Sequence, residues 1–333
     1  MKKFIAVLFL FLAAAVIALS FGEVEIILKT LRRAHLGFFA LALALQALAL
    51  FVSARMYLSI FRLLGLRESL FALTEISAAA TFVNIVTASG GAGGVALFAS
   101  EAKRRGHPVG KVTVAAALFL LLDQAAFLCV LALGLMILVR RNDLNSSEMF
   151  ASALLLVIAI AYAFVLYLGY RSESQLGGLL AKLARMVNRV GRFFARKQDV
   201  VSEERARQFA HEIAEGFSSL TEKPTSLIRP VLWGILEKAL LMLILVCAFL
   251  SFETPFTAGV IVAGFSLAYL FVVVSPTPHG IGIVEGIMPL ALSSLRVNWS
   301  EAVVIMLAYR AVTFWFPFSL GGLAFRSLHV QSK

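Results

Sequence analysis

The chain has few of the residues on which metal, redox and hydrolytic sites depend. It contains 2 cysteines, Cys129 and Cys247, which lie far apart in apolar runs and match no metal-binding or redox spacing. Free cysteines are commonly small buried residues, and we expect that role for both. The sequence also lacks an Asp-x-Asp metal pair, a cluster of metal ligands and a Ser-His-Asp set on predicted loops. We therefore expect no catalytic residues, no bound metal and no enzyme activity.

A nucleotide-binding motif is missing as well. The glycine cluster from Gly90 to Gly94 lacks the Gly-Lys-Ser/Thr ending of a P-loop, and no predicted strand precedes it. We therefore expect no cofactor, and any transport by this chain would be downhill or coupled to an ion. Glycines let a loop turn within a membrane, where an open helix end presents N–H donors to an anion such as a lipid phosphate. We expect this role for Ser89, Gly90 and Gly91.

Charged residues are scarce. Only 15% of the residues are charged, 60% are hydrophobic, and the mean hydropathy is +0.91. Such a composition is far from that of a soluble domain and indicates an integral membrane protein with several spans. Lys and Arg outnumber Asp and Glu by 30 to 19.

Apolar runs of spanning length predict an all-α polytopic membrane protein with about six full spans. The first run follows Met1-Lys2-Lys3 and could instead belong to a signal peptide. Its length of about 18 residues, or roughly 27 Å at the helical rise, favours a span. The predicted spans are 4–21, 36–61, 112–139, 150–169, 228–251 and 302–325.

Two further apolar segments, 70–105 and 256–295, are interrupted by glycine and proline at Thr87–Gly94 and at Ser275–Gly282. A broken helix exposes backbone groups that hydrocarbon cannot satisfy, so such breaks persist only where they are buried in protein or line a wet cavity. Paired breaks in corresponding halves point to a transporter's substrate site. We therefore expect two re-entrant helical hairpins.

The pattern repeats along the chain as an inverted-topology repeat. We expect a first repeat over 1–140 and a second over 150–326, interrupted by a cytoplasmic insert at 170–227. Its basic amphipathic helix would bind anionic lipid at the inner interface or pack on the bundle as a cap. With both hairpins re-entering, the inner loops hold most of the Lys and Arg residues. The positive-inside rule then places both termini in the cytoplasm, in the cell membrane.

Ionisable residues within the apolar runs are candidates for function. Each costs about 2.5–3.5 kcal/mol at a span centre, so such residues normally face the bundle interior and pair. Asp123 and Arg310 follow Gly91 and His279 at nearly equal separations, so we expect both to face a central cavity, where they could pair. A purely structural ion pair is the alternative. The six residues are Glu75, Asp123, Glu237, Lys238, Glu285 and Arg310.

Neighbours on a helix point about 100° apart, so Glu237 and Lys238 cannot both face one partner on the same helix. We expect one of them to snorkel to the inner interface. On 70–105, Asn84 lies in a stripe of small and polar residues that would line a cavity or serve as a helix-packing contact. Glu101 and Arg104 would hold a headgroup or be ordinary inner-surface charges.

At these residues the chain resembles the flippase-like membrane family named after the membrane region of lysylphosphatidylglycerol synthase, also known from the multiple peptide resistance factor. The resemblance covers nearly the whole chain. It rests on the glycine-rich first hairpin with Glu101 downstream, on the run from Pro276 to Glu285, and on Tyr309-Arg310. The family usually has glycine where this chain has His279. The resemblance implies movement of phospholipids or lipid-linked headgroups between leaflets. Because the chain stops at Lys333, we expect the aminoacyl-transferase activity of the bifunctional members to be absent.

We therefore expect a lipid translocator, with membrane phospholipids of charged headgroup as partners, and no nucleic acid. A secondary transporter of a small polar solute or ion remains open. So do a glycosyl or acyl transferase acting on lipid, a scaffold for a separate lipid-modifying enzyme, and a homo-oligomer. The expected substrate-binding residues are Asn84, Ser89, Gly90, Gly91, Glu101, Arg104, Asp123, Glu237, Pro276, Pro278, His279, Gly280, Gly282, Glu285 and Arg310.

Overall fold

The computed structural model describes residues 34–87, 91–140, 157, 160, 227–275 and 277–330, and every regular element in these ranges is helical. The all-helical class predicted from the sequence is thus confirmed for this part of the chain. The predicted spans 4–21 and 150–169 and the insert 170–227 lie outside the described residues, apart from Val157, Ile160 and Leu227.

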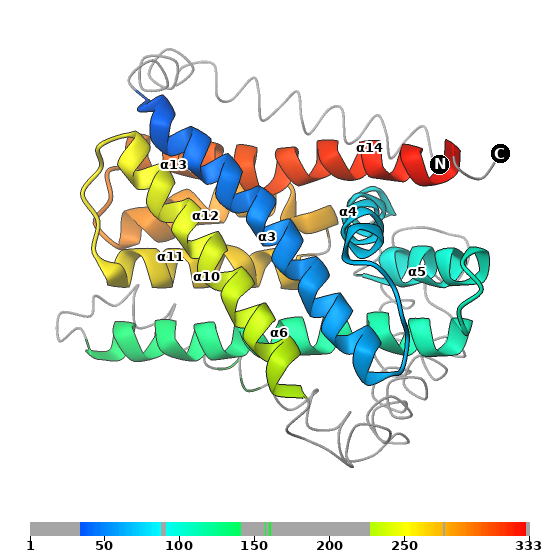
Figure 1. The fold of residues 1–333 in the computed structure, drawn as a ribbon. Helices are drawn as coiled ribbons and strands as arrows, with labels where there is room; N and C mark the ends of the chain where they lie inside the picture. Colours follow the sequence, from blue (N-terminus) through cyan, green and yellow to red (C-terminus); the bar gives the residue numbers. More distant parts are fainter. Residues whose placement is uncertain are drawn as a thin grey trace, which may run out of the picture.

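The described helices fall into two sets along the chain (Figure 1). The first set is α3 (Leu36–Leu63), α4 (Leu70–Thr87), α5 (Ala92–Arg104) and α6 (Val109–Arg140). The second set is α10 (Ile228–Ser251), α11 (Ala258–Val274), η2 (Pro278–Gly280), α12 (Ile283–Ser294), α13 (Trp299–Arg310), η3 (Ala311–Trp315) and α14 (Phe316–Val330).

Five stretches are long and apolar enough to cross a membrane. Four of them, α3, α6, α10 and the continuous helix from α13 to α14, coincide with predicted spans. The fifth is α4, which the sequence assigned to a re-entrant hairpin. Its 18 residues correspond to about 27 Å at the helical rise, enough to cross by itself. The re-entry of the first hairpin therefore stays a prediction.

At the first break, which follows α4, a side-chain hydrogen bond joins α4 to α5. Gly91, the residue just before α5, has a φ of 102°, a left-handed conformation that glycine adopts without strain. The backbone N–H of Gly94 donates to Oδ1 of Asn84 at 2.6 Å. A β-carbon on Gly94 would lie only 2.7 Å from the Asn84 amide. The glycine at 94 thus lets α5 approach α4 closely enough for this hydrogen bond.

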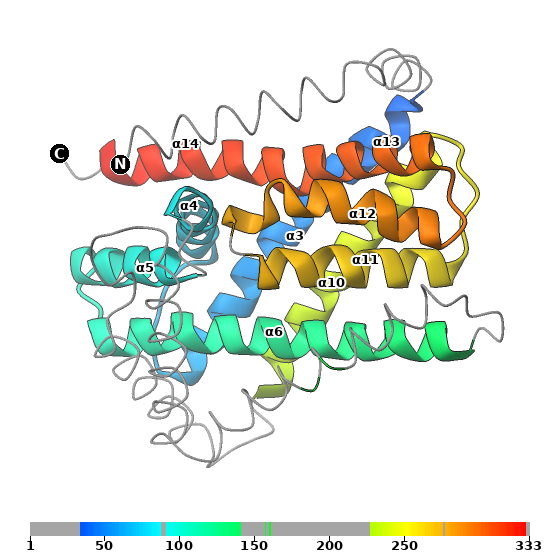
Figure 2. The ribbon, with the colours of Figure 1, turned by 180° about the vertical axis from the view of Figure 1, so that it is seen from behind.

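The second break separates α11 from α12, which lie side by side and run in opposite directions (Figure 2). The Thr277 hydroxyl donates to the carbonyl of Ile281 at 2.8 Å and also contacts the Ser275 hydroxyl at 2.7 Å. Gly280 and Gly282 have φ of 75° and 81°. Local hydrogen bonds therefore satisfy part of the backbone that the break exposes, as a break among apolar helices requires.

The two sets of helices pack across each other. The N–H of His35, just before α3, donates to the carbonyl of Ser251 at the end of α10 at 2.8 Å, so these two helices are antiparallel. Each hairpin packs on the long helix of the other set, α4 on α14 and α11 on α6. Gly321 of α14 lies against the backbone of Ala78, where a β-carbon would clash. Such small residues let membrane helices approach closely.

The last helix contains a π-helical turn, η3, between Arg310 and Phe316. Pro317 has no N–H to donate to the carbonyl of Thr313, and its ring would crowd that carbonyl in a regular α-helix. The wider turn relieves this conflict. π-Helical turns are frequent at functional sites, and this one directly follows Arg310.

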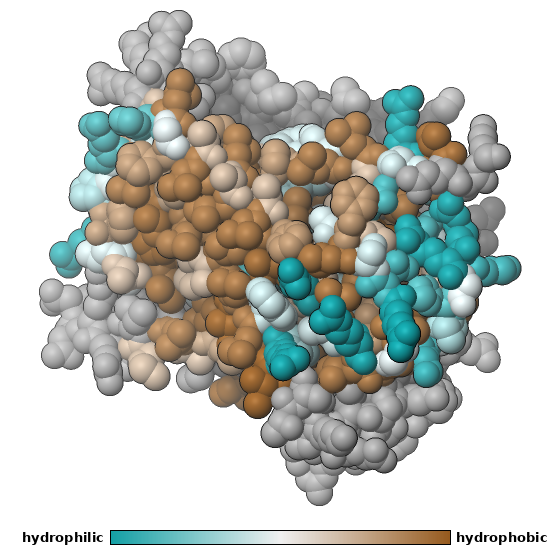
Figure 3. All heavy atoms as spheres, in the orientation of Figure 1, coloured by the Kyte–Doolittle hydropathy of each residue, from teal (hydrophilic) through white to brown (hydrophobic). Residues whose placement is uncertain are grey.

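The apolar core has two parts, one around α10–α13 and one around α3–α6. On the surface, apolar side chains cover much of the face in Figure 3, and hydrophilic ones gather at the end where α5 meets α6. The charged side chains at that end include Arg62, Arg67, Glu68, Lys103, Arg104, Arg105, Lys111 and Arg326, whereas Glu253, Arg296 and Glu301 lie in the connections at the other end.

Candidate functional site

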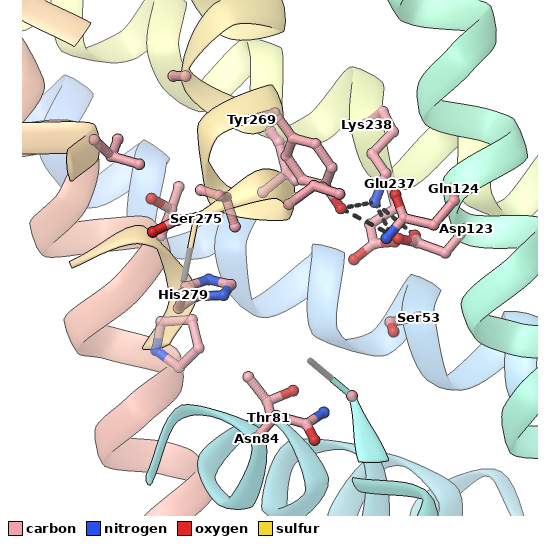
Figure 4. Close-up of a pocket in the computed structure, with 18 of the residues that line it drawn as sticks. Ser53, Thr81, Asn84, Asp123, Gln124, Glu237, Lys238, Tyr269, Ser275 and His279 are labelled. Atoms are coloured by element: carbon pink, nitrogen blue, oxygen red, sulfur yellow. Dashed lines mark hydrogen bonds and ion pairs between the residues drawn. The ribbon is translucent and has the colours of Figure 1, made fainter. Parts of the chain in front are cut away.

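A cavity of about 530 Å³ lies where the two sets of helices meet. Its wall includes residues of α3, α4, α6, α10, α11, η2, α12 and the continuous helix α13–α14. Many of the lining side chains are polar, although the helices that carry them are apolar (Figure 4). Polar groups in such surroundings require hydrogen-bond partners or water.

One wall carries a hydrogen-bonded cluster centred on Lys238, which is 1% exposed. Its Nζ lies 2.5 Å from Oδ1 of Asp123, 2.8 Å from the Tyr269 hydroxyl and 3.5 Å from Oε2 of Glu237. The Tyr269 hydroxyl in turn donates to Oδ2 of Asp123 at 3.2 Å. The cluster joins α6, α10 and α11 (Figure 4), and it brings two carboxylates to a single ammonium group.

The predicted snorkelling of Glu237 or Lys238 is wrong, because both residues line the cavity. The two side chains leave the helix in directions about 100° apart. The flexible four-carbon stem of lysine nevertheless brings its ammonium group to the carboxylates.

A second ion pair lies beside the second break. Nε of Arg310 is 2.7 Å from Oε1 of Glu285, and Nη2 of Arg310 donates to the carbonyl of His279 at 3.3 Å. The Gly282 N–H donates to the other Glu285 oxygen, Oε2, at 2.7 Å. Glu285 thus satisfies a backbone donor at the N-terminus of α12, where the helix dipole favours a carboxylate, and anchors Arg310 to the turn.

Asp123 and Arg310 line the same cavity, but they do not form the pair that was considered possible. Asp123 pairs with Lys238, and Arg310 pairs with Glu285. The cost of burying charge directs such residues inward. This cost does not determine which residue becomes the partner. Asp123 and Arg310 each pair with a residue on their own side of the cavity.

Sequence reasoning missed several polar residues of the cavity wall, among them Tyr269, Gln46 and Gln124. Gln46 is 4% exposed, and the Oε1 atoms of Gln46 and Gln124 are buried without a hydrogen-bond partner among the described residues. The two glutamines could have been identified from the sequence, because an amide within a predicted span, like a charge, costs free energy to bury.

Glu101 and Arg104 do not line the cavity. Glu101 is buried and lies 2.6 Å from Nη1 of Arg104, which also donates to the carbonyl of Leu328 at 2.8 Å. Arg104 ties the end of α5 to α14, away from the cavity wall. A headgroup-binding role for Glu101 and Arg104 stays a prediction. Gly91, just before α5, lies at the cavity, but the last turn of α5 is about three turns away.

Glu68 belongs to this end of the bundle too, outside the spanning helices. It lies 3.1 Å from Nε2 of His107 and 3.6 Å from Nη1 of Arg105. Burial alone would raise the pKa of Glu68. Hydrogen bonds from the Ser69 N–H and His107, together with the Arg105 charge, outweigh burial and lower this pKa below its ordinary value. An ionised Glu68 therefore joins the loop after α3 to the loop after α5.

The remaining predicted residues divide into three groups. Asn84, Gly91 and His279 line the cavity. Pro278, Gly280 and Gly282 belong to the turn between α11 and α12, where Pro278 begins η2. Ser89, Gly90 and Pro276 lie outside the described residues.

The arrangement offers binding groups of both signs in one cavity. Arg310 supplies cationic donors beside the second break, and Asp123 and Glu237 supply one carboxylate more than Lys238 neutralises. Within the described ranges, no group of three or more His, Cys, Asp or Glu residues could hold a metal ion. The geometry therefore suits binding of a polar or charged group within the bundle.

Comparison with known proteins fits a membrane protein of this kind. No curated protein matches the chain. A family model, described as the lysylphosphatidylglycerol synthase TM region, matches residues 4–321. The match includes both interrupted hairpins and every residue of the cavity wall. The chain therefore belongs to the lysylphosphatidylglycerol synthase TM-region family, whose membership suggests a lipid-related function in a membrane.

Proposed function

We propose that this protein moves a phospholipid or lipid-linked headgroup between the leaflets of the cell membrane. The headgroup enters the cavity while the acyl tails stay in the surrounding lipid. The observation that carries the proposal is the cavity, whose wall includes the buried Lys238–Asp123 ion pair, the buried Arg310 and many polar side chains among apolar helices where the two hairpins meet.

The size of the cavity fits this division of the lipid. Its volume of about 530 Å³ lies within the range of about 300–1,000 Å³ that is typical of small-ligand pockets. A headgroup fits such a space, whereas a whole phospholipid with two acyl chains does not. Lipid movement with the tails outside the protein therefore requires only a polar path for the headgroup.

The packing supports an inverted repeat with alternating access. In an inverted repeat, equivalent helices run in opposite directions and the substrate site lies at the repeat interface. The antiparallel pair of α3 and α10, and the exchange of hairpins between α6 and α14, have this pattern. We infer that the two halves rock about the cavity, which then opens to each side in turn.

The charge distribution supports an orientation. The end that carries Arg62, Lys103, Arg105 and Arg326 faces the cytoplasm in this proposal, because short cytoplasmic loops carry an excess of Lys and Arg. That end also meets the anionic inner leaflet, to which basic residues near the surface are attracted.

The test is lipid movement in vesicles that contain only this protein. Purified protein is reconstituted into liposomes with a trace of fluorescent phospholipid, and a membrane-impermeant quencher measures the fraction in the outer leaflet over time. We expect faster exchange than in empty liposomes, and a large loss of rate in Arg310→Ala. An unchanged rate in this variant would count against the cavity. Uptake of a polar solute without lipid movement would favour a solute transporter.

A further inference from the structure

His279 has a backbone conformation that is unusual for its residue type. Its φ and ψ are 51° and 30°, in the left-handed region, where a residue with a β-carbon is strained by about 1–3 kcal/mol. Glycine would adopt the same angles freely, as Gly280 and Gly282 do in this turn. A strained side chain retained at a cavity wall points to a use for that side chain.

The imidazole of His279 lies on the cavity wall (Figure 4). Arg310 lines the same cavity and donates to the backbone carbonyl of His279. It stacks on the ring of Phe314, with ring centroids 5.7 Å apart and an interplanar angle of 29°. The guanidinium carbon of Arg310 lies 4.6 Å from the centroid of the same ring. The ring of Phe314 therefore contacts both side chains and holds the imidazole of His279 and the guanidinium group of Arg310 in place.

Both side chains keep unused hydrogen-bonding groups. Arg310 uses Nε for Glu285 and Nη2 for the His279 carbonyl, and its Nη1 has no partner among the described residues. The ring nitrogens of His279 likewise have no hydrogen bond within the described part of the chain. Either neutral tautomer of the imidazole presents one N–H donor, so two donors from adjacent residues are available.

The surroundings of this pair favour an anion. The carboxylate that contacts Arg310, Glu285, is occupied by Arg310 Nε and the Gly282 N–H. The polar residues nearby in the wall are uncharged: Ser275 and Thr277 in the turn, and Thr81 and Asn84 on α4 (Figure 4). The unbalanced carboxylate of the cavity belongs to the Lys238 cluster on another wall.

We propose that His279 and Arg310 together bind a phosphate group, with the imidazole N–H and Arg310 Nη1 donating to two of its oxygens. His279 is then a specificity-determining residue that makes the site prefer phosphate over an anion with a single accessible oxygen. This proposal rests on the proposed function only in taking the phosphate from a lipid headgroup. Free phosphate offers the same oxygens, and the experiment separates the two sources.

The test uses substitutions that fit the left-handed backbone. His279→Gly removes the imidazole and relieves the strain. His279→Asn keeps a donor near the position of Nδ1, and His279→Gln keeps one near Nε2. Glu253→Gly is the matched control, because Glu253 has a φ of 52° in the loop between α10 and α11, away from the cavity wall.

Binding is measured as the rise in melting temperature of the full chain in a phosphate-free detergent. The probes are inorganic phosphate and dihexanoylphosphatidylglycerol. For each probe that the wild-type protein binds, we expect Kd to rise about tenfold in His279→Gly. This is the loss typical of one charge-assisted hydrogen bond. Glu253→Gly and at least one of His279→Asn and His279→Gln should keep the wild-type Kd. Both glycine variants should melt at or above the wild-type temperature.

The two probes and a vesicle assay separate the possible failures. Wild-type binding of both probes by His279→Gly, with binding lost in Arg310→Gln, would overturn the role of His279. Loss of binding for inorganic phosphate alone would support the phosphate site but contradict a lipid source. Loss for the lipid probe supports both, provided that lipid movement in proteoliposomes falls in the same variant. Intact binding without lipid movement in the wild type would contradict the translocator alone.

Discussion

At the residue scale, Lys238 is the side chain on which the charges of the cavity converge. It is the single ammonium group beside Asp123 and Glu237, and it is almost fully buried. Removing one partner of a buried ion pair leaves an uncompensated charge, which typically costs about 3–5 kcal/mol. We therefore expect Lys238→Met to lower the free energy of unfolding by about this amount, measured by chemical or thermal unfolding in detergent.

The control for this prediction is the double variant Asp123→Asn/Lys238→Met. It removes the ammonium group together with one carboxylate, so a substantial part of the lost stability should return. A single variant that unfolds at the wild-type temperature would show that the cluster contributes nothing to stability.

Gln46 tests whether an orphaned amide is kept for function. Its buried Oε1 has no hydrogen-bond partner among the described residues, and such a group costs about 1–3 kcal/mol. Gln46→Leu should leave stability unchanged or raise it, while the rate of lipid movement in vesicles falls, because the ligand loses an acceptor. Ser266→Ala is the matched control. Its Oγ is equally orphaned but does not line the cavity, so it should alter neither rate nor fold.

The sequence predicted several of the charged residues that line the cavity, but it did not predict which of them form ion pairs with each other. The energetic cost of a charge among apolar residues identified Asp123, Glu237 and Arg310 from the sequence alone. Their partners depend on which helices meet, and this is a long-range property of the fold. The contact of Arg104 with the carbonyl of Leu328 on α14 has the same origin, since the position of Arg104 along α5 did not reveal it.

At the element scale, the breaks followed from local chemistry. Clusters of glycine and proline favour an interruption of a helix, so both breaks were predictable, although single residues such as Pro317 and Gly321 lie inside a helix. The bounds of α10 coincide with the predicted span 228–251. The π-helical turn was not predicted, because a proline in a helix can equally produce a kink or an end. Here the proline is accommodated by a wider turn, and Arg310 and Phe314 at this turn contact His279 of the second break.

Two adjacent glycines of α14 provide a test of the contact between α14 and α4. A β-carbon on Gly321 would clash with the backbone of Ala78, whereas one on Gly322 would meet only the edge of the Phe82 ring at 3.4 Å. Gly321→Ala should therefore lower the free energy of unfolding by about 1–3 kcal/mol through overpacking. Gly322→Ala should raise it by up to about 1 kcal/mol through helix propensity. Equal melting temperatures for both would contradict the close approach of these helices.

At the scale of the whole molecule, the cavity exists because two cores pack side by side without merging. One core surrounds α10–α13, the other α3–α6, and the polar wall lies where they meet. The sequence indicated the two halves through the matching breaks. The antiparallel contact of α3 with α10, which brings the halves together, could not be predicted from the sequence. An apolar run does not indicate which face of its helix contacts another helix.

The proposed rocking of the halves makes a prediction about access to the cavity. Ser53 lines it from α3, and Ser53→Cys places a thiol there in a background with Cys129→Ala and Cys247→Ala. A membrane-impermeant thiol reagent should label this residue when added to either side of oriented proteoliposomes, because alternating access exposes the cavity to each side in turn. Labelling is measured by mass spectrometry.

The background substitutions are needed because the prediction that both cysteines are buried is wrong for Cys129, which is exposed and offers a second thiol, whereas Cys247 is buried. Ile244→Cys is the control, since Ile244 is 0% exposed in the core around α10–α13 and should be labelled from neither side. Reaction of Ser53→Cys from one side alone would mean that the cavity has a single fixed opening. A single opening can bind a headgroup but cannot deliver it to the opposite leaflet, so that result would separate a lipid-binding protein from a lipid translocator.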